Sequence, residues 1–173
     1  VEESSGQRRQ ILNLIAVILV IFVNVIANFW QLNGFSTVEL FVANPTFITP
    51  IPLTFGAWVF VYAGLLAYAI FQLLPDQRQQ DYQERISYWL VADGILNMLW
   101  VYAWHQGNKS VSLFLSIMQL ASIGWIYYRL EIGKRDANAI ERLLVHLPIS
   151  AHTAWSMIVS AISLLSIVDP VKW

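Results

Sequence analysis

The sequence lacks cysteine and has little charge. Without cysteine there are no disulfides, thiolate metal sites or cysteine nucleophiles. Charged residues make up only 12% of the 173 residues, about half their share in ordinary soluble domains, and the net charge of −1 points to no nucleic-acid partner. The chain also lacks a nucleophile elbow, a phosphate loop and metal-ligand spacing. These absences exclude a soluble globular enzyme, and we expect the protein not to be an enzyme.

Apolar residues are abundant instead. Hydrophobic side chains make up 57% of the chain and aromatic ones 14%, with eight tryptophans, and the mean hydropathy is +0.56. A membrane span needs about 20 apolar residues, and the apolar runs are continuous rather than alternating, which disfavours a barrel. The sequence therefore predicts an all-α integral membrane protein, a single domain over residues 1–173 that folds as a five-transmembrane-helix bundle. The predicted spans are 11–30, 55–74, 87–104, 111–130 and 148–168, with a long first loop at 31–54.

Basic residues predict the orientation of the bundle. Five spans place the N-terminus and the second and fourth connections on one side, which carries eight basic residues against two on the other. The eight are Arg8, Arg9, Arg78, Arg85, Arg129, Lys134, Arg135 and Arg142, and the two are Lys109 and Lys172. We therefore expect the N-terminus on the cytoplasmic side and the C-terminus on the opposite side. Trp30, Trp104 and Trp173 are then expected at the outer interface, and Trp89 at the inner one.

Three spans carry polar or aromatic stripes at helical spacing. These are Asn24 and Asn28; Phe55, Trp58 and Tyr62; and Asp93, Asn97, Trp100 and Trp104. Lipid offers no hydrogen bonds, so such stripes should face the interior. They predict an aromatic cavity under the first loop that suits a flat, mostly apolar ligand. The alternative is that the aromatic residues pack helices or anchor interfaces, and that the asparagines bond helix to helix.

Two histidines and one acid stand out near the spans. Asp93 is the only acid well inside a span, where a carboxylate is costly and is by default a functional candidate. His152 lies at a similar depth in the last span, so the two are expected to form an intramembrane polar pair. His105 closes the third span, where an imidazole is suited to haem iron or a propionate, or is simply solvated. We predict no metal site.

The ordered set of motifs resembles the TspO/MBR family, the tryptophan-rich sensory proteins related to the translocator protein, and is most similar to their cyanobacterial and plant-like branch. The motifs are Asn24-x-x-Ala27-Asn28, Leu32-Asn33-Gly34, Ile48-Thr49-Pro50, Phe55-x-x-Trp58-x-x-x-Tyr62, Leu74-Pro75-Asp76-Gln77-Arg78, Asn97-x-x-Trp100-x-x-x-Trp104-His105, and Leu147-Pro148-Ile149-Ser150 with Trp155. The resemblance implies a five-helix fold that commonly dimerises. It also implies a tetrapyrrole pocket at Trp58, Tyr62, Asn97, Trp100 and Trp155.

The chain departs from the family pattern at three places. Ser163 stands where asparagine is usual, His152 replaces a tyrosine, and the loop 31–54 has no tryptophan, which disfavours porphyrin breakdown. We therefore predict a membrane receptor or carrier that binds a porphyrin, haem or chlorophyll-type tetrapyrrole, in stress signalling or transport, with membrane lipid and a second copy as partners. The alternative is an accessory subunit of a larger, photosynthetic membrane complex without ligand activity of its own.

Overall fold

The computed structural model describes residues 2–168, and all regular structure within them is helical. Five long helices form the body. They are α1 (Glu2–Phe29), α3 (Ala57–Phe71), α5 (Trp89–His105), α6 (Lys109–Arg129) and α8 (Leu147–Val168). Short elements connect them: η1 (Leu32–Gly34), α2 (Thr37–Ala43), η2 (Pro52–Gly56), η3 (Pro75–Gln77), α4 (Asp81–Ile86), α7 (Ala139–Glu141) and a π-helical turn, η4 (Arg142–His146).

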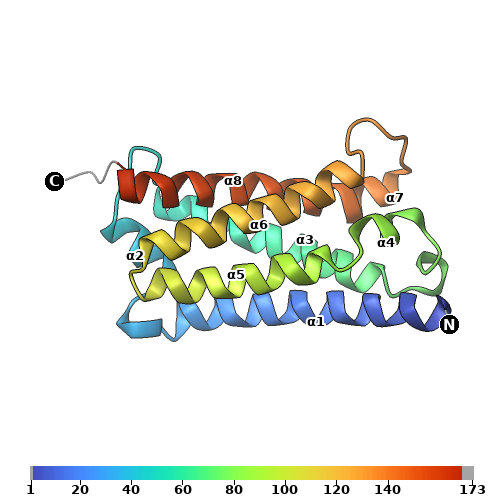
Figure 1. Cartoon of the computed structure of the whole chain (residues 1–173), viewed down its shortest axis with the longest axis horizontal. Coiled ribbons are helices and arrows are strands. Elements are labelled where there is room, and N and C mark those ends of the chain that lie inside the picture. Colours follow the sequence, from blue (N-terminus) through green and yellow to red (C-terminus); the bar gives the residue numbers. More distant parts are fainter. Residues whose placement is uncertain (1, 169–173) are drawn as a thin grey trace.

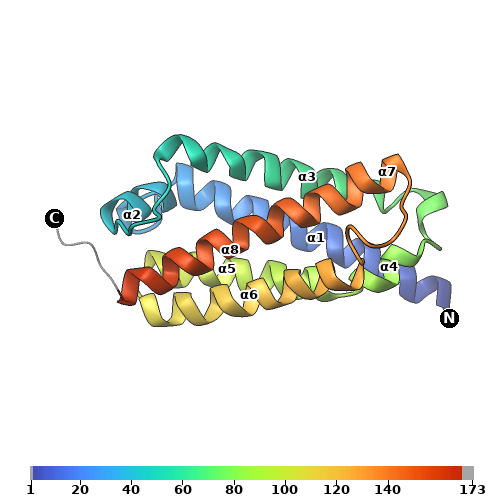
Figure 2. The ribbon, with the colours of Figure 1, turned by 90° about the horizontal axis from the view of Figure 1, so that it is seen from above.

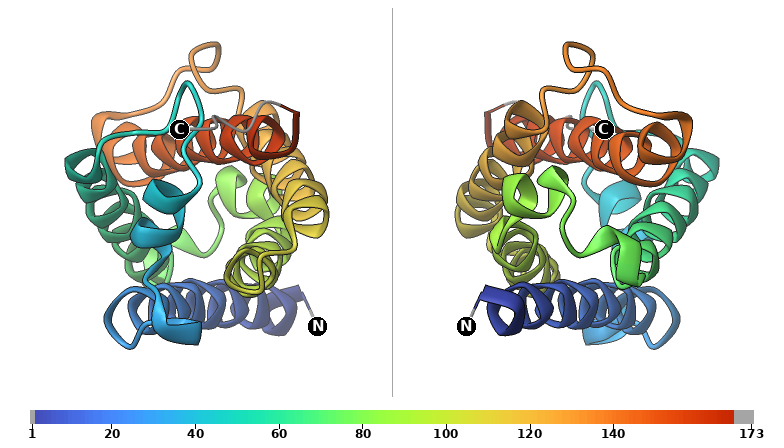
Figure 3. Two further views of the ribbon diagram at one scale, coloured as in Figure 1. Left: turned by 90° about the vertical axis from the view of Figure 1, so that its left-hand side faces the viewer. Right: turned by 90° about the vertical axis from the view of Figure 1, so that its right-hand side faces the viewer.

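The long helices run alternately up and down one axis (Figure 1). They close a ring in the order α1, α5, α6, α8 and α3, which is visible end-on in Figure 3. Consecutive long helices are therefore not always neighbours, because α1 separates α3 from α5. Helix α2 lies across one end of the bundle, against α1 and α5 (Figure 2). The side chains that point into the ring come from all five long helices.

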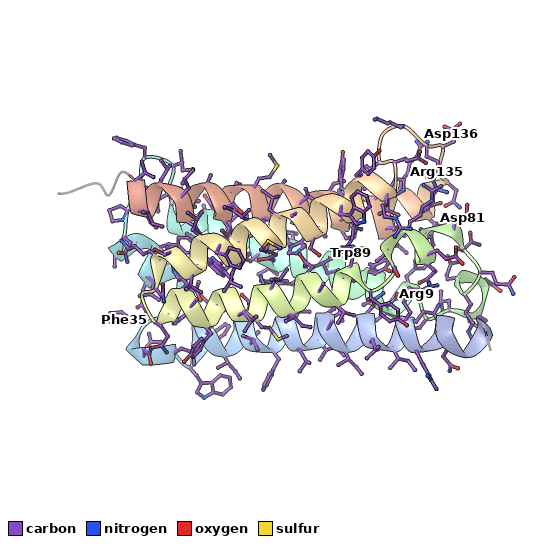
Figure 4. All side chains as sticks on the ribbon, in the orientation of Figure 1. Arg9, Phe35, Asp81, Trp89, Arg135 and Asp136 are labelled. Carbon is purple, nitrogen blue, oxygen red and sulfur yellow. The ribbon has the colours of Figure 1, made fainter. Side chains whose placement is uncertain are left out.

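The two ends of the bundle differ in composition. One end, here the lid end, carries residues 31–56 and the turn between α5 and α6 (Figure 1). The other, the charged end, carries the start of α1 and residues 72–88 and 130–146. Figure 4 shows Arg9, Asp81, Arg135 and Asp136 near the charged end and Phe35 at the lid end. The eight basic residues predicted to share a side thus lie at one end, whereas Lys172 and Trp173 fall outside the described residues.

Four stretches among residues 2–168 are long and apolar enough to cross a membrane. They are Gly6–Phe29, Leu53–Phe71, Lys109–Arg129 and Ala139–Val168. Helix α5 has 17 residues, or about 26 Å at the α-helical rise, slightly less than the roughly 30 Å hydrocarbon core of a bilayer. Large apolar side chains face outward along the bundle, among them Phe22, Phe60 and Phe114. This surface suits lipid rather than water.

The first loop is more ordered than its sequence suggested. Ser36 caps α2 by accepting a hydrogen bond from the Glu39 backbone N–H, and the Glu39 carboxylate accepts one from the Ser36 backbone in return. This capping box starts a helix within the loop. Trp104, predicted at the outer interface, does not face outward as an interfacial anchor would. The residue is only 5% exposed, because α5 turns it inward to pack against Trp100 and Phe41.

Buried glutamines close the charged end. Gln10 of α1 donates from Nε2 to the Gln72 carbonyl oxygen at 2.5 Å, and Gln72 returns a bond to the Gln10 carbonyl at 3.1 Å. Gln83 of α4 donates to the same Gln72 carbonyl at 3.1 Å. All three side chains are almost fully buried. These reciprocal bonds tie α1, the end of α3 and α4 into one unit.

Candidate ligand site

Aromatic side chains from three helices converge inside the lid-end half of the ring. Trp58 of α3 and Trp155 of α8 meet edge to face with ring centroids 5.5 Å apart. Trp100 of α5 stacks on Trp104 at 5.6 Å. All four indoles are buried. Helical spacing on each element places these rings on its inner face, so the predicted aromatic stripes do point inward.

Three of these rings, those of Trp58, Trp100 and Trp155, line a small cavity with polar neighbours. Its lining residues are Asn24, Trp58, Tyr62, Asn97, Trp100, Gln119, His152, Trp155, Ser156 and Val159. The cavity measures about 10 Å³, room for at most one water molecule. Sites for drug-sized ligands measure roughly 300–1,000 Å³. The cavity is therefore closed in this state, and a planar ligand needs side chains to move.

Two buried polar contacts cross the cavity walls. Asn24 donates from Nδ2 to Asn97 Oδ1 at 2.8 Å, joining α1 to α5. Asp93 Oδ2 lies 2.8 Å from His152 Nε2, joining α5 to α8, and both side chains are at most 4% exposed. The residues expected to pair thus meet. Asn28 instead bonds the carbonyl of Asn24 in its own helix.

Several buried polar atoms of the lining have no hydrogen-bond partner among residues 2–168. These atoms are Asn24 Oδ1, Trp100 Nε1, His152 Nδ1, Trp155 Nε1 and Ser156 Oγ. A buried donor without an acceptor costs about 1–3 kcal/mol, and native proteins keep few of them. Asn24 Oδ1 is an acceptor, whereas the two indole N–H groups are donors that fit a water or a ligand that carries acceptor atoms.

Phe41 of α2 closes the top of this aromatic cluster. Its ring is fully buried, with its centroid 4.7 Å from that of Trp104 and 5.2 Å from that of Phe55. The rings of Trp100 and Trp58 lie 6.0 and 6.4 Å away. The first loop therefore inserts one of its own aromatic side chains where the predicted pocket should open.

His105 holds the first loop in place. Its Nδ1 lies 3.0 Å from the Leu32 carbonyl oxygen, and its Nε2 lies 2.9 Å from the Thr37 hydroxyl. A carbonyl only accepts, so Nδ1 carries the proton and Nε2 accepts from Thr37. Asn33 adds a bond to the His105 carbonyl at 3.1 Å. In this closed state both ring nitrogens of His105 are engaged within the protein, and the residue does not line the inner cavity. Its contact with a ligand stays a prediction.

A second, larger space lies between α1 and α3, beneath Val38 of α2. This lateral groove measures about 510 Å³ and is mostly apolar. Its lining is Ile21, Asn24, Val25, Asn28, Phe29, Val38, Phe55, Trp58, Val59, Tyr62, Ala63 and Leu66. It shares Asn24, Trp58 and Tyr62 with the inner cavity. These three side chains are thus the wall between groove and cavity.

The predicted site residues that line these spaces therefore divide into three groups. Trp58 and Tyr62 line both spaces, Asn97, Trp100 and Trp155 line only the cavity, and Phe55 and Asn28 line only the groove. Sequence reasoning missed Phe41, Gln119 and Ser156. For Phe41 a signal was present, because the spacing from Ser36 to Glu39 is that of a capping box followed by apolar residues, which predicts a short helix with one buried face.

Fold and site together define a helical membrane bundle with an aromatic, partly polar interior site under a loop. The chain belongs to the TSPO-like protein family, whose sequence profile matches residues 10–173. Proteins of this family generally bind or transport ligands rather than catalyse reactions. No curated protein and no solved structure matches the chain significantly.

Proposed function

We propose that the protein is a TspO-type membrane receptor or carrier for a planar tetrapyrrole. The observation that carries this proposal is the set of unpartnered donors and indole rings around a cavity that the loop plugs with Phe41. Indole rings stack on a flat macrocycle, and their N–H groups donate to its carboxylates. Phe41 then occupies, in the closed state, the space that the ligand takes in the open one.

Ligand entry follows from the shared wall. An apolar ligand dissolved in the membrane reaches the groove between α1 and α3, which has enough volume for a small-molecule site. Rotation of Trp58 and Tyr62, together with withdrawal of Phe41, joins the groove to the inner cavity. The loop rises as a lid, and its position reports occupancy to a partner in transport or signalling.

The proposal includes the topology. Helix α5 is enclosed between α1 and α6, so we assign it as a fifth span despite its 17 residues. The basic charged end then faces the cytoplasm, with the N-terminus, and the lid end faces the opposite side. Reporter fusions at the two chain ends should give opposite signals, and matching signals would refute five spans. A homodimer is proposed on family resemblance alone, and cross-linking in native membranes tests it.

The central experiment is a protoporphyrin titration of the purified full chain, read by quenching of tryptophan fluorescence. Saturable quenching is expected. Trp58→Ala and Trp100→Ala should weaken binding by about 1–3 kcal/mol, by analogy with base stacking on aromatic side chains. Trp89→Ala, an exposed indole at the start of α5 that lines neither the cavity nor the groove, is the matched control and should leave affinity unchanged. Phe41→Ala should strengthen or speed binding, because it removes the plug.

A second candidate function is supported by the same closed cavity. A space of about 10 Å³ is also what a fixed accessory subunit of a larger membrane complex would have after losing its ligand. Purification from native membranes in mild detergent separates the two. Stoichiometric recovery with other subunits, together with no porphyrin binding by any variant, would favour the subunit. Recovery as a monomer or dimer with a Soret band would favour the receptor.

A further inference from the structure

A cationic pocket lies at the charged end, where α6 stops. It measures about 310 Å³ and is lined by Arg85, Tyr127, Tyr128, Arg129, Glu131, Ile132 and Lys134. Three cations and one carboxylate give this lining a net charge of +2. The pocket shares no residue with the tetrapyrrole site. Its charge suits an anion.

Its central arginine is fixed in place. Arg85 of α4 donates from Nη1 to the Arg129 carbonyl oxygen at 2.7 Å and to Glu131 Oε2 at 2.9 Å. These bonds use two of the five N–H donors of the guanidinium. The chain turns sharply after α6 through positive φ angles of 51° at Glu131 and 82° at Gly133. The turn brings Lys134 to the same pocket as Arg85 and Arg129.

The pocket lies at the depth of lipid headgroups. The exposed face of helix α6 is apolar from Val111 to the last turn. Trp125 stacks on Tyr128 there, with centroids 5.6 Å apart. Both rings are exposed. Exposed tryptophan and tyrosine at the end of a span mark the membrane–water interface. An anion held beside them is therefore at the surface of the bilayer.

The surroundings favour a lipid over a free anion. Asp81 and Glu84 line an adjoining cavity that shares Arg85 and Arg129. Figure 4 shows Asp81 nearer the end of the molecule and Trp89 nearer its middle. A soluble anion approaching from water meets this acidic edge first. A lipid headgroup instead arrives along the aromatic side of the pocket, from within the membrane.

We propose that this pocket binds the phosphate of an anionic phospholipid. The arginine guanidiniums offer paired donors to phosphate oxygens, and Lys134 adds a point charge. Basic pockets between helices at the cytoplasmic surface bind acidic headgroups in this way. The acyl chains lie along the exposed apolar face of α6, past Tyr127 and Tyr128. The lipid then fastens the turn after α6 to the membrane surface.

The test measures lipid affinity of the full chain in neutral detergent, by native mass spectrometry and thermal shift. The probes are dioleoylphosphatidylglycerol, dioleoylphosphatidylcholine and inorganic phosphate. Phosphatidylglycerol should bind best, and inorganic phosphate at equal concentration should not displace it. The double variant Arg129→Gln/Lys134→Gln should bind it about 25-fold more weakly, at about fivefold for each removed charge. Arg78→Gln/Arg142→Gln removes the same charge at exposed positions outside the pocket. It should weaken binding far less, because exposed charges away from the bound phosphate are screened by salt.

Each contrary result overturns the proposal. Equal weakening in both double variants would show diffuse attraction to the charged end rather than a site. Equal affinity for phosphatidylcholine and phosphatidylglycerol would show that the pocket does not recognise headgroup charge. Displacement of phosphatidylglycerol by inorganic phosphate would show a site for a soluble anion. The side chain of Lys134 is exposed. If Arg129→Gln/Lys134→Gln does not fold, Lys134→Gln alone should still weaken phosphatidylglycerol binding about fivefold.

Discussion

The two ends of the bundle are closed by opposite kinds of interaction. At the lid end, the ring of Phe41 packs among aromatic rings, and His105 holds the loop with two hydrogen bonds. At the charged end, reciprocal amide bonds join Gln10 and Gln72, and ion pairs join Arg85 to Glu131 and Arg135 to Glu141. One closure is mainly apolar and the other is polar and directional.

Because of this difference, the lid end can exchange its packing contacts for those of a ligand, whereas the charged end cannot. Apolar contact is non-directional, so a flat ligand can replace Phe41 against the same rings. The polar contacts that opening breaks there are those of His105 with Leu32 and Thr37. A buried amide that loses its partner costs about 1–3 kcal/mol, so opening the charged end strands several groups at once. We infer that the lid end moves and the charged end stays shut.

The largest expected effect lies at the cavity wall between the two ends. His152→Phe leaves the buried Asp93 carboxylate without its partner at 2.8 Å, and should lower the free energy of unfolding by about 3–5 kcal/mol. Adding Asp93→Leu should restore part of that loss, because no buried charge then remains. A double-mutant cycle measured by unfolding in detergent checks this. Additive losses would show that the two side chains do not interact.

The next largest effect tests whether the charged end stays closed. Gln72→Leu keeps the side-chain volume but strands the Gln10 carbonyl and the Tyr68 hydroxyl, which both bond the Gln72 side chain. Stability should fall by about 2–3 kcal/mol, while protoporphyrin affinity stays the same. Gln79→Leu, an exposed neighbour, is the matched control and should stay within about 0.5 kcal/mol. A change in ligand affinity with Gln72→Leu would mean that the ends are coupled.

Much of the fold was predictable from sequence, for physical reasons. Long apolar runs predict the long helices, because in lipid the backbone must form its hydrogen bonds within the protein. Pro75 and Gly107 predict turns. Cavity residues such as Trp58 and Asn97 were predictable because polar and aromatic groups on one helical face must point inward. Basic residues sorted to one end for the same kind of reason, since charge is costly within the bilayer.

The lid was not predictable in the same way. Phe41 reaches Trp104, and Thr37 reaches His105, only because α2 folds back across the bundle. Local sequence patterns do not predict which part of the bundle a loop contacts. Apolar packing also accepts many partners, so residue types predicted an aromatic pocket but not that the protein fills it itself. The sequence shows the chemistry of the His105 ring, but it does not show that Leu32 and Thr37 bond both ring nitrogens.

A smaller effect tests whether the lid end opens independently. Thr37→Val is nearly isosteric and removes the hydroxyl that bonds His105 Nε2 at 2.9 Å. The loss of about 0.5–1.5 kcal/mol should favour the open lid, so amide exchange in residues 36–43 should accelerate about fivefold while exchange at 72–88 is unchanged. Thr153→Val removes a hydroxyl that bonds only its own helix and serves as control. Equal acceleration at both ends would contradict a lid that opens independently.

The smallest effect is a pH dependence confined to the lid. The backbone N–H and the hydroxyl of Ser36 hold the pKa of the Glu39 carboxyl below its usual value. Because the folded pKa is lowered, the capping contribution is present above the ordinary carboxyl range and is lost as pH falls through the folded value. Amide exchange in residues 36–43, corrected for intrinsic rates, should therefore rise below about pH 4. Glu39→Gln cannot ionise at this position, so amide exchange in its lid should show no such rise. Exchange around the buried Gln10, Gln72 and Gln83 should be the same in Glu39→Gln as in the unchanged protein. An identical rise in Glu39→Gln would assign the titration to another group. The lid would then be held by Phe41 and His105 without help from its cap.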